Sequence, residues 1–165
     1  MAGQLAVSGI AVTPMQSQHA ADFRRLNLEW IERLFKVEAP DLEVLDDPVG
    51  SIIGRGGMVF VALDGDAVVG TAAMIRGAPD RYELAKMAVA ASHQRRGIGE
   101  LLGMACTAYA AEHGIRTVFL ETNSSLDGAM RLYERLGFRH APFPHPSDYA
   151  RGDVYMELEV YPARS

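Results

Sequence analysis

Two apolar segments joined by a three-residue turn constrain the fold of this chain most. Residues 58–63 (MVFVAL) and 67–75 (AVVGTAAMI) are rich in apolar and β-branched side chains, and short runs of this kind bounded by turn residues are typical of buried strands. The turn between them, Asp64-Gly65-Asp66, holds a glycine that can adopt the positive φ of a tight hairpin. The two segments are therefore predicted to pair as antiparallel strands.

Strand-like and helix-like segments alternate around this hairpin and predict a mixed α/β fold. Further strands are expected at 9–12, 82–89 and 117–121, around Phe138, and at 153–160, and helices at 19–36, 101–112 and between Ser124 and Gly137. The helix at 101–112 is apolar nearly all round and is expected to be deeply buried. The Ser-x-x-acid spacing from Ser124 to Asp127 predicts a capped N-terminus for the last helix.

Two connecting segments have distinctive compositions. Residues 37–50 contain five acidic side chains and no lysine or arginine, which predicts an acidic loop with room for a short helix. Residues 142–146 hold three prolines and are expected to form a stiff loop.

Length and composition narrow the class of protein. A chain of 165 residues is expected to form one domain, residues 1–165. Its net charge of -5 argues against general binding to nucleic acids or anionic membranes. No signal-peptide pattern and no apolar run of ~18 residues occurs, and the single Cys106 cannot close an intrachain disulfide. These features predict a cytoplasmic protein, and no cluster of side chains has the spacing of a metal site.

The loop His93-Gln94-Arg95-Arg96-Gly97-Ile98-Gly99 lies between a predicted strand and a predicted helix. Glycines at 97 and 99 would let a phosphate approach backbone amides at a helix N-terminus, with charge added by the two arginines. The alternative is an ordinary turn with two solvated arginines. No Gly-x-x-x-x-Gly-Lys-Ser/Thr pattern occurs, which argues against a nucleoside triphosphatase.

Taken together, residues 82–139 resemble the GNAT superfamily of acyl-CoA-dependent N-acetyltransferases. The resemblance rests on the strand 83–89 (ELAKMAV), the loop Gln94-x-x-Gly97-x-Gly99, a strand that ends in Glu121-Thr122-Asn123, and the motif Leu132-Tyr133-Glu134-x-x-Gly137-Phe138. It implies an α/β (α+β) fold whose mostly antiparallel mixed sheet is splayed between the fourth and fifth strands and flanked by about four helices. It also implies transfer of an acetyl group directly from acetyl-CoA to a primary amine of a small molecule or protein, without a metal. Homodimers are common in such families.

The same resemblance assigns the coenzyme-binding residues. Main-chain amides of the loop would hold the pyrophosphate, and the Val89 amide would polarise the thioester carbonyl, although a valine side chain alone is more often simply core. The coenzyme-binding residues expected are Met87, Ala88, Val89, Gln94, Arg95, Arg96, Gly97, Ile98, Gly99, Glu100, Asn123 and Tyr133. Without the resemblance, Asn123 would equally suit a turn ahead of the helix.

Two side chains are expected to move protons. Glu83 matches the position of a catalytic base that several family members carry, with Glu121 and bulk water as competitors and a solvated or salt-bridged glutamate as the alternative. Tyr133 matches the tyrosine that protonates the departing thiolate, or else it only packs. Because Cys106 lies among apolar residues of a predicted helix, a covalent acyl-enzyme is not expected.

The acceptor site is less defined by the sequence. Trp30, Glu83 and Glu121 are predicted to bind the acceptor, with Trp30 and Phe35 alternatively in the core. Asp41, Asp46 and Asp47 could attract a cationic amine or form a solvated face, and Arg151 could bind an acceptor carboxylate or pair locally. A noncatalytic acyl-CoA-binding or regulatory module with the same fold is the alternative function.

Overall fold

The computed structural model describes residues 7–162, which form a seven-stranded sheet in the order β1-β2-β3-β4-β5-β7-β6. Every neighbouring pair is antiparallel except β4 and β5, which are parallel. The strands are β1 (Ile10–Pro14), β2 (Met58–Asp64), β3 (Ala67–Ala78), β4 (Arg81–Val89), β5 (Thr117–Thr122), β6 (Arg139–His140) and β7 (Val154–Glu159). The mixed, mostly antiparallel sheet expected from the sequence is confirmed.

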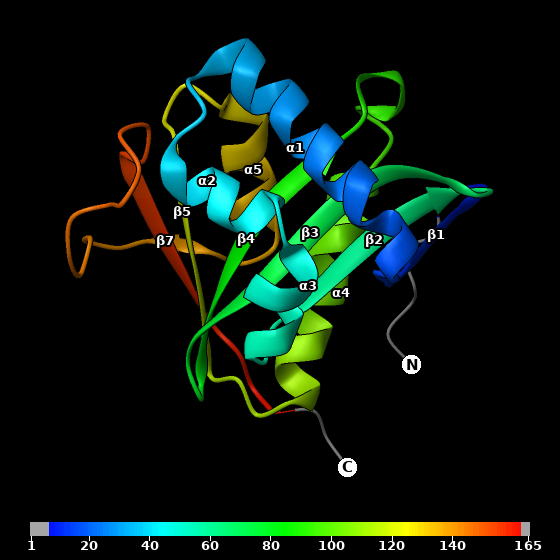
Figure 1. Ribbon diagram of the computed structural model, residues 1–165. Helices are drawn as coiled ribbons and strands as arrows, with labels where there is room; N and C mark the ends of the chain where they lie inside the picture. The colour runs from blue at the N-terminus through cyan, green and yellow to red at the C-terminus, as the bar shows by residue number, and fades with distance from the viewer. Residues whose placement is uncertain (1–6, 163–165) are drawn as a thin grey trace.

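Helices cover both faces of the sheet. Figure 1 shows α1, α2 and α3 on the near face, and α4 and α5 behind it. Among residues 7–162 the α-helices are α1 (Ala20–Leu34), α2 (Ala39–Leu45), α3 (Pro48–Ser51), α4 (Ile98–Glu112) and α5 (Asp127–Arg135), one more than the four or so expected. None of these helices is long and apolar enough to cross a membrane.

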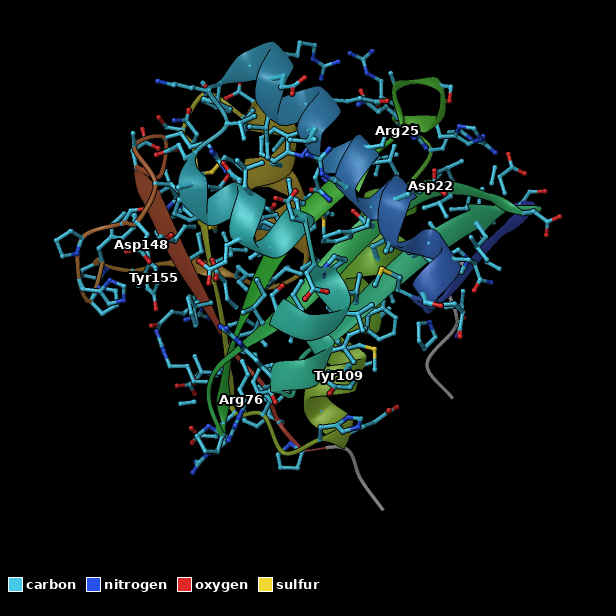
Figure 2. All side chains as sticks on the ribbon, in the orientation of Figure 1. Asp22, Arg25, Arg76, Tyr109, Asp148 and Tyr155 are labelled. Atoms are coloured by element: carbon cyan, nitrogen blue, oxygen red, sulfur yellow. The ribbon has the colours of Figure 1, made fainter. Side chains whose placement is uncertain are left out.

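Each face has its own apolar core. Phe23, Leu26 and Ile31 of α1 pack with Val59 and Val61 of β2 on one side. On the other side, one face of α4 packs against the sheet, with Leu102 and Cys106 completely buried. The opposite face of α1 is polar and carries an exposed Arg25–Asp22 ion pair of 3.0 Å (Figure 2), so α1 is amphipathic as its periodicity predicts.

The hairpin has the predicted geometry. Strand β2 ends at Asp64, β3 begins at Ala67, and Gly65 between them has a φ of +61°. Only three residue pairs join β4 to β5, from Arg81↔Thr117 to Glu83↔Phe119, although β4 continues to Val89. The two strands therefore diverge beyond Glu83, which confirms the predicted splay between the fourth and fifth strands.

Strand β4 also bulges where it diverges. Thr71 of β3 pairs with Ala88, whereas Ala73 pairs with Ala85, so β4 holds one extra residue across this interval. Lys86 within it has a φ of +52°, in the left-handed region. A bulge of this kind redirects the main chain locally, here beside the opening between β4 and β5.

Three sequence predictions need correction. The acidic segment is more helical than the loop with one short helix that was expected, because residues 39–45 and 48–51 form two helices, with Pro40 and Pro48 in first turns where their missing N–H groups cost nothing. Helix α4 starts at Ile98 rather than Leu101. Ser124 does not cap α5; its amide and hydroxyl both donate to the carboxylate of Asp153.

The proline-rich segment behaves as expected. Residues 141–153 contain no helix or strand. Asn123 and Ser124, just after β5, hydrogen bond to Arg151 and Asp153 at the end of this segment. The loop is thereby fixed against the sheet on the side where β4 and β5 separate.

Candidate active site

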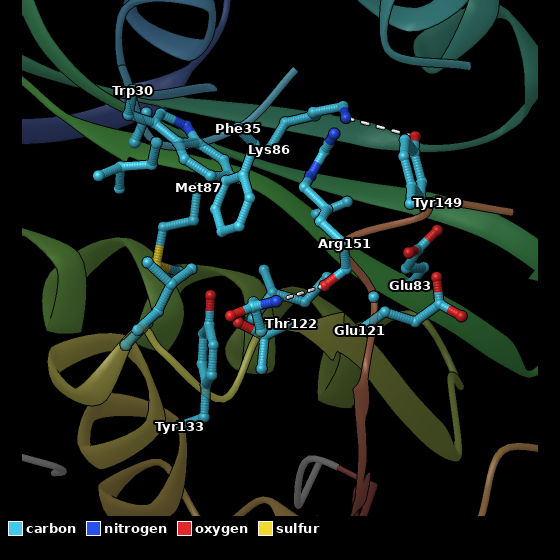
Figure 3. Close-up of a pocket in the computed structure, with 18 of the residues that line it drawn as sticks. Trp30, Phe35, Glu83, Lys86, Met87, Glu121, Thr122, Tyr133, Tyr149 and Arg151 are labelled. Atoms are coloured by element: carbon cyan, nitrogen blue, oxygen red, sulfur yellow. Dashed lines mark hydrogen bonds between the residues drawn. The ribbon is translucent and has the colours of Figure 1, made fainter. Parts of the chain in front are cut away.

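A pocket of about 270 Å³ opens where β4 and β5 separate (Figure 3). Its walls come from the end of α1, the length of β4, the end of β5, the start of α5 and the 141–153 loop. The side chains that line it include Trp30, Leu34, Phe35, Glu83, Lys86, Met87, Val89, Gln94, Glu121, Asn123, Tyr133, Tyr149 and Arg151.

Backbone amides of β4 face this opening. The Ala90 amide donates to the Val69 carbonyl at 2.8 Å, which directs it toward β3. Because successive amides of an extended strand point to opposite sides, the Val89 amide points away from β3, toward the pocket. The Lys86 carbonyl is held on the β3 side, so the Met87 amide on the same peptide plane also points toward the pocket.

The loop between β4 and α4 presents further amides. Arg95 and Gly97 have φ values of +62° and +82°, and α4 begins at the next residue. The amides of Ile98, Gly99 and Glu100 lie in the first helical turn, where no intrahelical acceptor exists. Left-handed residues beside a helix N-terminus form a concave set of N–H donors that suits a phosphate or diphosphate, so the backbone here fits the pyrophosphate of coenzyme A.

The side chains of this loop are less suited to binding a ligand than its backbone amides are. Ile98 is buried in the core at 1% exposure, so only its main chain is open to a ligand. Arg95 and Arg96 are exposed. Gln94 lines the pocket and its side-chain amide donates to the Val89 carbonyl at 3.2 Å. His93 anchors the loop through a 2.8 Å contact with Asp64 of the hairpin.

Glu83 and Glu121 come together at one end of the pocket, from β4 and β5 (Figure 3). Burial raises the pKa of Glu83 to about 7, and the charge of Glu121 adds to this effect while Lys86 opposes it. Burial also raises the pKa of Glu121, which accepts a 3.3 Å hydrogen bond from Ser147. A carboxylate that titrates near neutral pH can accept a proton and release it again.

Tyr133 projects from α5 with its hydroxyl in the pocket (Figure 3). Its ring packs edge-to-face on that of Phe138, with 6.1 Å between the ring centroids. Both residues belong to the motif Leu132-Tyr133-Glu134-x-x-Gly137-Phe138. Burial raises the pKa of Tyr133 to about 12, so the hydroxyl carries its proton at neutral pH and is available as a donor.

A buried ion cluster lies beside the pocket: Asp41, Lys86, Arg151 and Glu38. Asp41 is completely buried and binds Lys86 Nζ at 2.7 Å and Arg151 at 2.5 Å, and Arg151 also binds Glu38 at 3.2 Å. Burial by itself would raise the pKa of Asp41, but hydrogen bonds from Arg151 and Lys86 outweigh it and lower this pKa to about 2. Because Asp41 is buried, Asp41, Asp46 and Asp47 do not form one solvated acidic face, which was an alternative left open by the sequence.

Arg151 forms ion pairs with Glu38 and Asp41 of its own chain, which are distant in the sequence, and is not left unpaired for an acceptor carboxylate. Asp46 forms an exposed ion pair with Arg24, and Asp47 caps α3 through the Gly50 amide. Sequence reasoning missed the Lys86–Asp41 pair. Lys86 lies at one of the positions of β4 whose side chains are buried, and a buried lysine signals an acidic partner. That partner, Asp41, is 45 residues away in the chain.

The remaining predicted residues lie as follows. Trp30 and Phe35 line the pocket and contact each other edge-to-face at 6.2 Å. Asn123 also lines it, but its amide donates to the Arg151 carbonyl and its oxygen accepts from Ser125. The residues expected to bind the coenzyme that do not line this pocket are the consecutive loop positions Arg95, Arg96, Gly97, Ile98, Gly99 and Glu100.

Comparison with known proteins gives consistent results. The model of the acetyltransferase (GNAT) family matches residues 22–138. The uncharacterized N-acetyltransferase YvbK of Bacillus subtilis is 29% identical over 111 residues, which cover 66% of this chain and 72% of that protein. The chain covers less than two thirds of the length of several other curated relatives that it matches.

Solved structures share the fold at low sequence identity. A GNAT-family acetyltransferase from Staphylococcus aureus has a TM-score of 0.82 and 19% identity, with 92% of this chain and 99% of that chain covered. A GNAT-family acetyltransferase from Elizabethkingia anophelis, solved with acetyl-CoA bound, has a TM-score of 0.69 and 19% identity, with 93% and 99% covered.

Proposed function

The chain belongs to the acetyltransferase (GNAT) family, and on that premise we propose that it transfers an acetyl group directly from acetyl-CoA to a primary amine, with both substrates bound at once. The observation that carries the proposal is the convergence of three groups on one pocket: the Val89 amide, the Glu83 carboxylate and the Tyr133 hydroxyl. They supply the three things that amide formation from a thioester requires.

In this proposal, backbone N–H groups bind acetyl-CoA. The amides of Ile98, Gly99 and Glu100 bind the diphosphate at the N-terminus of α4, where the left-handed Gly97 leaves them accessible. The amides of Met87 and Val89 face the chain that runs from this diphosphate into the opening between β4 and β5. The Val89 amide stabilises the negative charge that develops on the thioester oxygen.

Glu83 accepts the proton of the amine. A typical alkylammonium has a pKa of about 10.4 and is not nucleophilic, so a base must remove a proton before or during attack. The raised pKa of Glu83, about 7, suits this task near neutral pH. The neutral nitrogen then forms a bond to the carbonyl carbon.

Tyr133 provides the last proton. As the carbon–sulfur bond breaks, the electron pair remains on sulfur and the Tyr133 hydroxyl protonates it, so that coenzyme A leaves as a thiol. The nitrogen, once bonded to the carbonyl carbon, loses its second proton to solvent, Tyr133 regains a proton from solvent, and Glu83 releases the proton it accepted, so that the ammonium and the thioester give a neutral amide, a thiol and one net proton. Direct transfer is supported by Cys106, which is completely buried in the core and whose pKa is raised by burial, so it is no nucleophile.

Thiol release in the presence of acetyl-CoA and a panel of primary amines tests this proposal. We expect amine-dependent release. Double-reciprocal plots of the initial rate, with both substrates varied, should give intersecting lines, as direct transfer requires. Parallel lines would contradict direct transfer. Binding of acetyl-CoA with no turnover on a broad panel would instead favour a noncatalytic acyl-CoA-binding or regulatory module.

A further inference from the structure

Two sets of charged side chains line the pocket. The positive charges of one set are neutralised by acids, whereas the negative charges of the other set are not. The two cations that line it, Lys86 and Arg151, are both paired with buried or half-buried acids of α2 and its N-terminus. Asp41 and Glu38 carry two negative charges and the cations two positive charges, so this ion cluster is neutral as a unit. Neither cation is free to pair with an anionic group of a ligand.

The two acids at the end of the pocket are in the opposite situation. Within residues 7–162, neither Glu83 nor Glu121 forms an ion pair, and Glu121 accepts only the Ser147 hydroxyl. Asp148 in the neighbouring loop adds negative charge near both, with His145 as the basic group that opposes it at Glu121. A ligand in the pocket therefore meets a net negative field, which attracts a cation and repels a carboxylate.

The end of the pocket at the C-terminus of α1 is largely apolar, with the Arg151 guanidinium 5.9 Å from the centre of the Trp30 ring. Trp30 and Phe35 line it, and Leu34 beside them is 49% exposed at its edge. Figure 3 shows the Trp30 and Phe35 rings at the opposite end of the pocket from Glu83 and Glu121. Large apolar side chains left open at the edge of a pocket are expected where a ligand covers them.

We propose that the acceptor is an arylalkyl amine without a carboxylate, its apolar part against Trp30, Leu34 and Phe35 and its ammonium group toward Glu83 and Glu121. This inference rests on the proposed function and narrows its substrate class. It excludes free amino acids as good acceptors because their carboxylate would find both cations of the site already paired and two unpaired acids nearby.

A matched set of acceptors tests the inference: 2-phenylethylamine, phenylalanine amide and phenylalanine, assayed by thiol release at saturating acetyl-CoA. The amide and the free acid have the same skeleton and differ in the carboxylate charge and in the basicity of the amine, so kcat/KM is compared per concentration of neutral amine. We expect kcat/KM for 2-phenylethylamine and phenylalanine amide to exceed that for phenylalanine by about 100-fold. Equal or better use of phenylalanine would overturn the inference.

The apolar part of the proposal is tested with ethylamine, which has the amine but no ring. We expect kcat/KM for ethylamine to be at least about tenfold lower than for 2-phenylethylamine. In Trp30→Ala the ratio of kcat/KM for 2-phenylethylamine to that for ethylamine should fall. An unchanged preference in this variant, or equal use of both amines by the natural chain, would contradict binding of the ring at this end.

A charge variant tests the role of the ion cluster. Glu38→Gln removes one acid partner of Arg151 and leaves the cluster with a net positive charge. We expect the ratio of kcat/KM for phenylalanine to that for phenylalanine amide to rise about tenfold. Glu43→Gln, an exposed glutamate of α2 that belongs to no ion pair of the described chain, is the matched control. The same ratio in both variants would overturn the neutralisation argument.

Failure of this inference is distinguishable from failure of the proposed function. If folded protein binds acetyl-CoA and acetylates no amine, the proposed function is wrong. If it acetylates phenylalanine in preference to phenylalanine amide, the enzyme is an acetyltransferase and only the acceptor class is wrong.

Discussion

The hydroxyl of Thr71 donates a 3.0 Å hydrogen bond to the carbonyl of Lys86, at the bulge of β4. The side-chain amide of Asn27 in α1 donates to the same hydroxyl oxygen at 3.2 Å and to the Phe23 carbonyl at 2.9 Å. Thr71 and Asn27 are completely buried. This connection holds the Lys86 carbonyl toward β3, so the next amide, that of Met87, points into the pocket.

Replacing Thr71 with valine keeps the side-chain shape but removes this donor and leaves the buried Lys86 carbonyl without it. We expect the free energy of unfolding to fall by about 1–3 kcal/mol, measured by urea denaturation, and kcat to fall because the bulge is less well fixed. Thr71→Ser keeps the hydroxyl and serves as the control. A Thr71→Val variant with the midpoint and kcat of the natural chain would show that the bulge does not depend on this bond.

Features that depend on neighbouring residues could be predicted from the sequence. The Asp64-Gly65-Asp66 turn and the strand-like segment 82–89 both depend on a few neighbouring residues, and the structure contains the hairpin and the strand that they indicate. The loop with Gly97 does lead into a helix, although that helix begins at Ile98 and not at Leu101. The splay between β4 and β5 came from the family resemblance rather than from any local pattern, because its cause is the pairing of distant strands.

Features that depend on distant partners could not be predicted. Asp41 sits in an acidic segment that looks solvated, but it is buried because Lys86 and Arg151, 45 and 110 residues further along the chain, neutralise it. Ser124 matches a helix-capping pattern, but Asp153 competes for its hydroxyl. In both cases a tertiary contact replaced the local interaction that the sequence suggested.

Gly97→Ala is expected to weaken coenzyme binding. The φ of +82° at Gly97 strains any residue with a Cβ by about 1–2 kcal/mol, and relaxation of that strain would move the amides at the start of α4. We expect acetyl-CoA affinity, measured by calorimetry, to fall about tenfold or more. Gly114→Ala introduces similar strain, at a φ of +70° with open space around it and far from the loop. Equal losses of affinity in both variants would contradict a specific role for the loop.

The pH dependence of turnover should follow Glu83. The proposed base acts as a carboxylate, and its pKa is raised to about 7, so activity should rise as the pH increases through about 7. Glu83→Gln should lack this rise in activity and keep only the rise caused by deprotonation of the substrate ammonium group. In Glu121→Gln the rise should move to lower pH, because a negative neighbour that raises the Glu83 pKa is removed. A pH profile unchanged in Glu83→Gln would assign the base elsewhere.

Asp41 is expected to make the protein sensitive to strong acid. Its pKa is lowered to about 2 in the folded protein from 3.8, so its contribution to stability, about 2 kcal/mol, is present above pH 4 and is lost as the pH falls through about 2. Side-chain carboxyl NMR should show Asp41 titrating near pH 2. Titration of Asp41 close to 3.8 would mean that its ion pairs do not stabilise the fold.

Tyr133→Phe separates the chemistry of the hydroxyl from the packing of the ring. The ring would keep its edge-to-face contact with Phe138, so we expect the free energy of unfolding and the affinity for acetyl-CoA to change little. Without a proton donor for the departing sulfur, kcat should fall by about 100-fold or more, measured by thiol release and by single-turnover quenching so that product release is not mistaken for chemistry. Phe138→Leu, which alters the packing but keeps the hydroxyl, is the comparison variant and should lose stability rather than most of its kcat. If Tyr133→Phe turned over at the natural rate, the sulfur would leave without help from this residue, and Tyr133 would be a packing residue of the pocket wall.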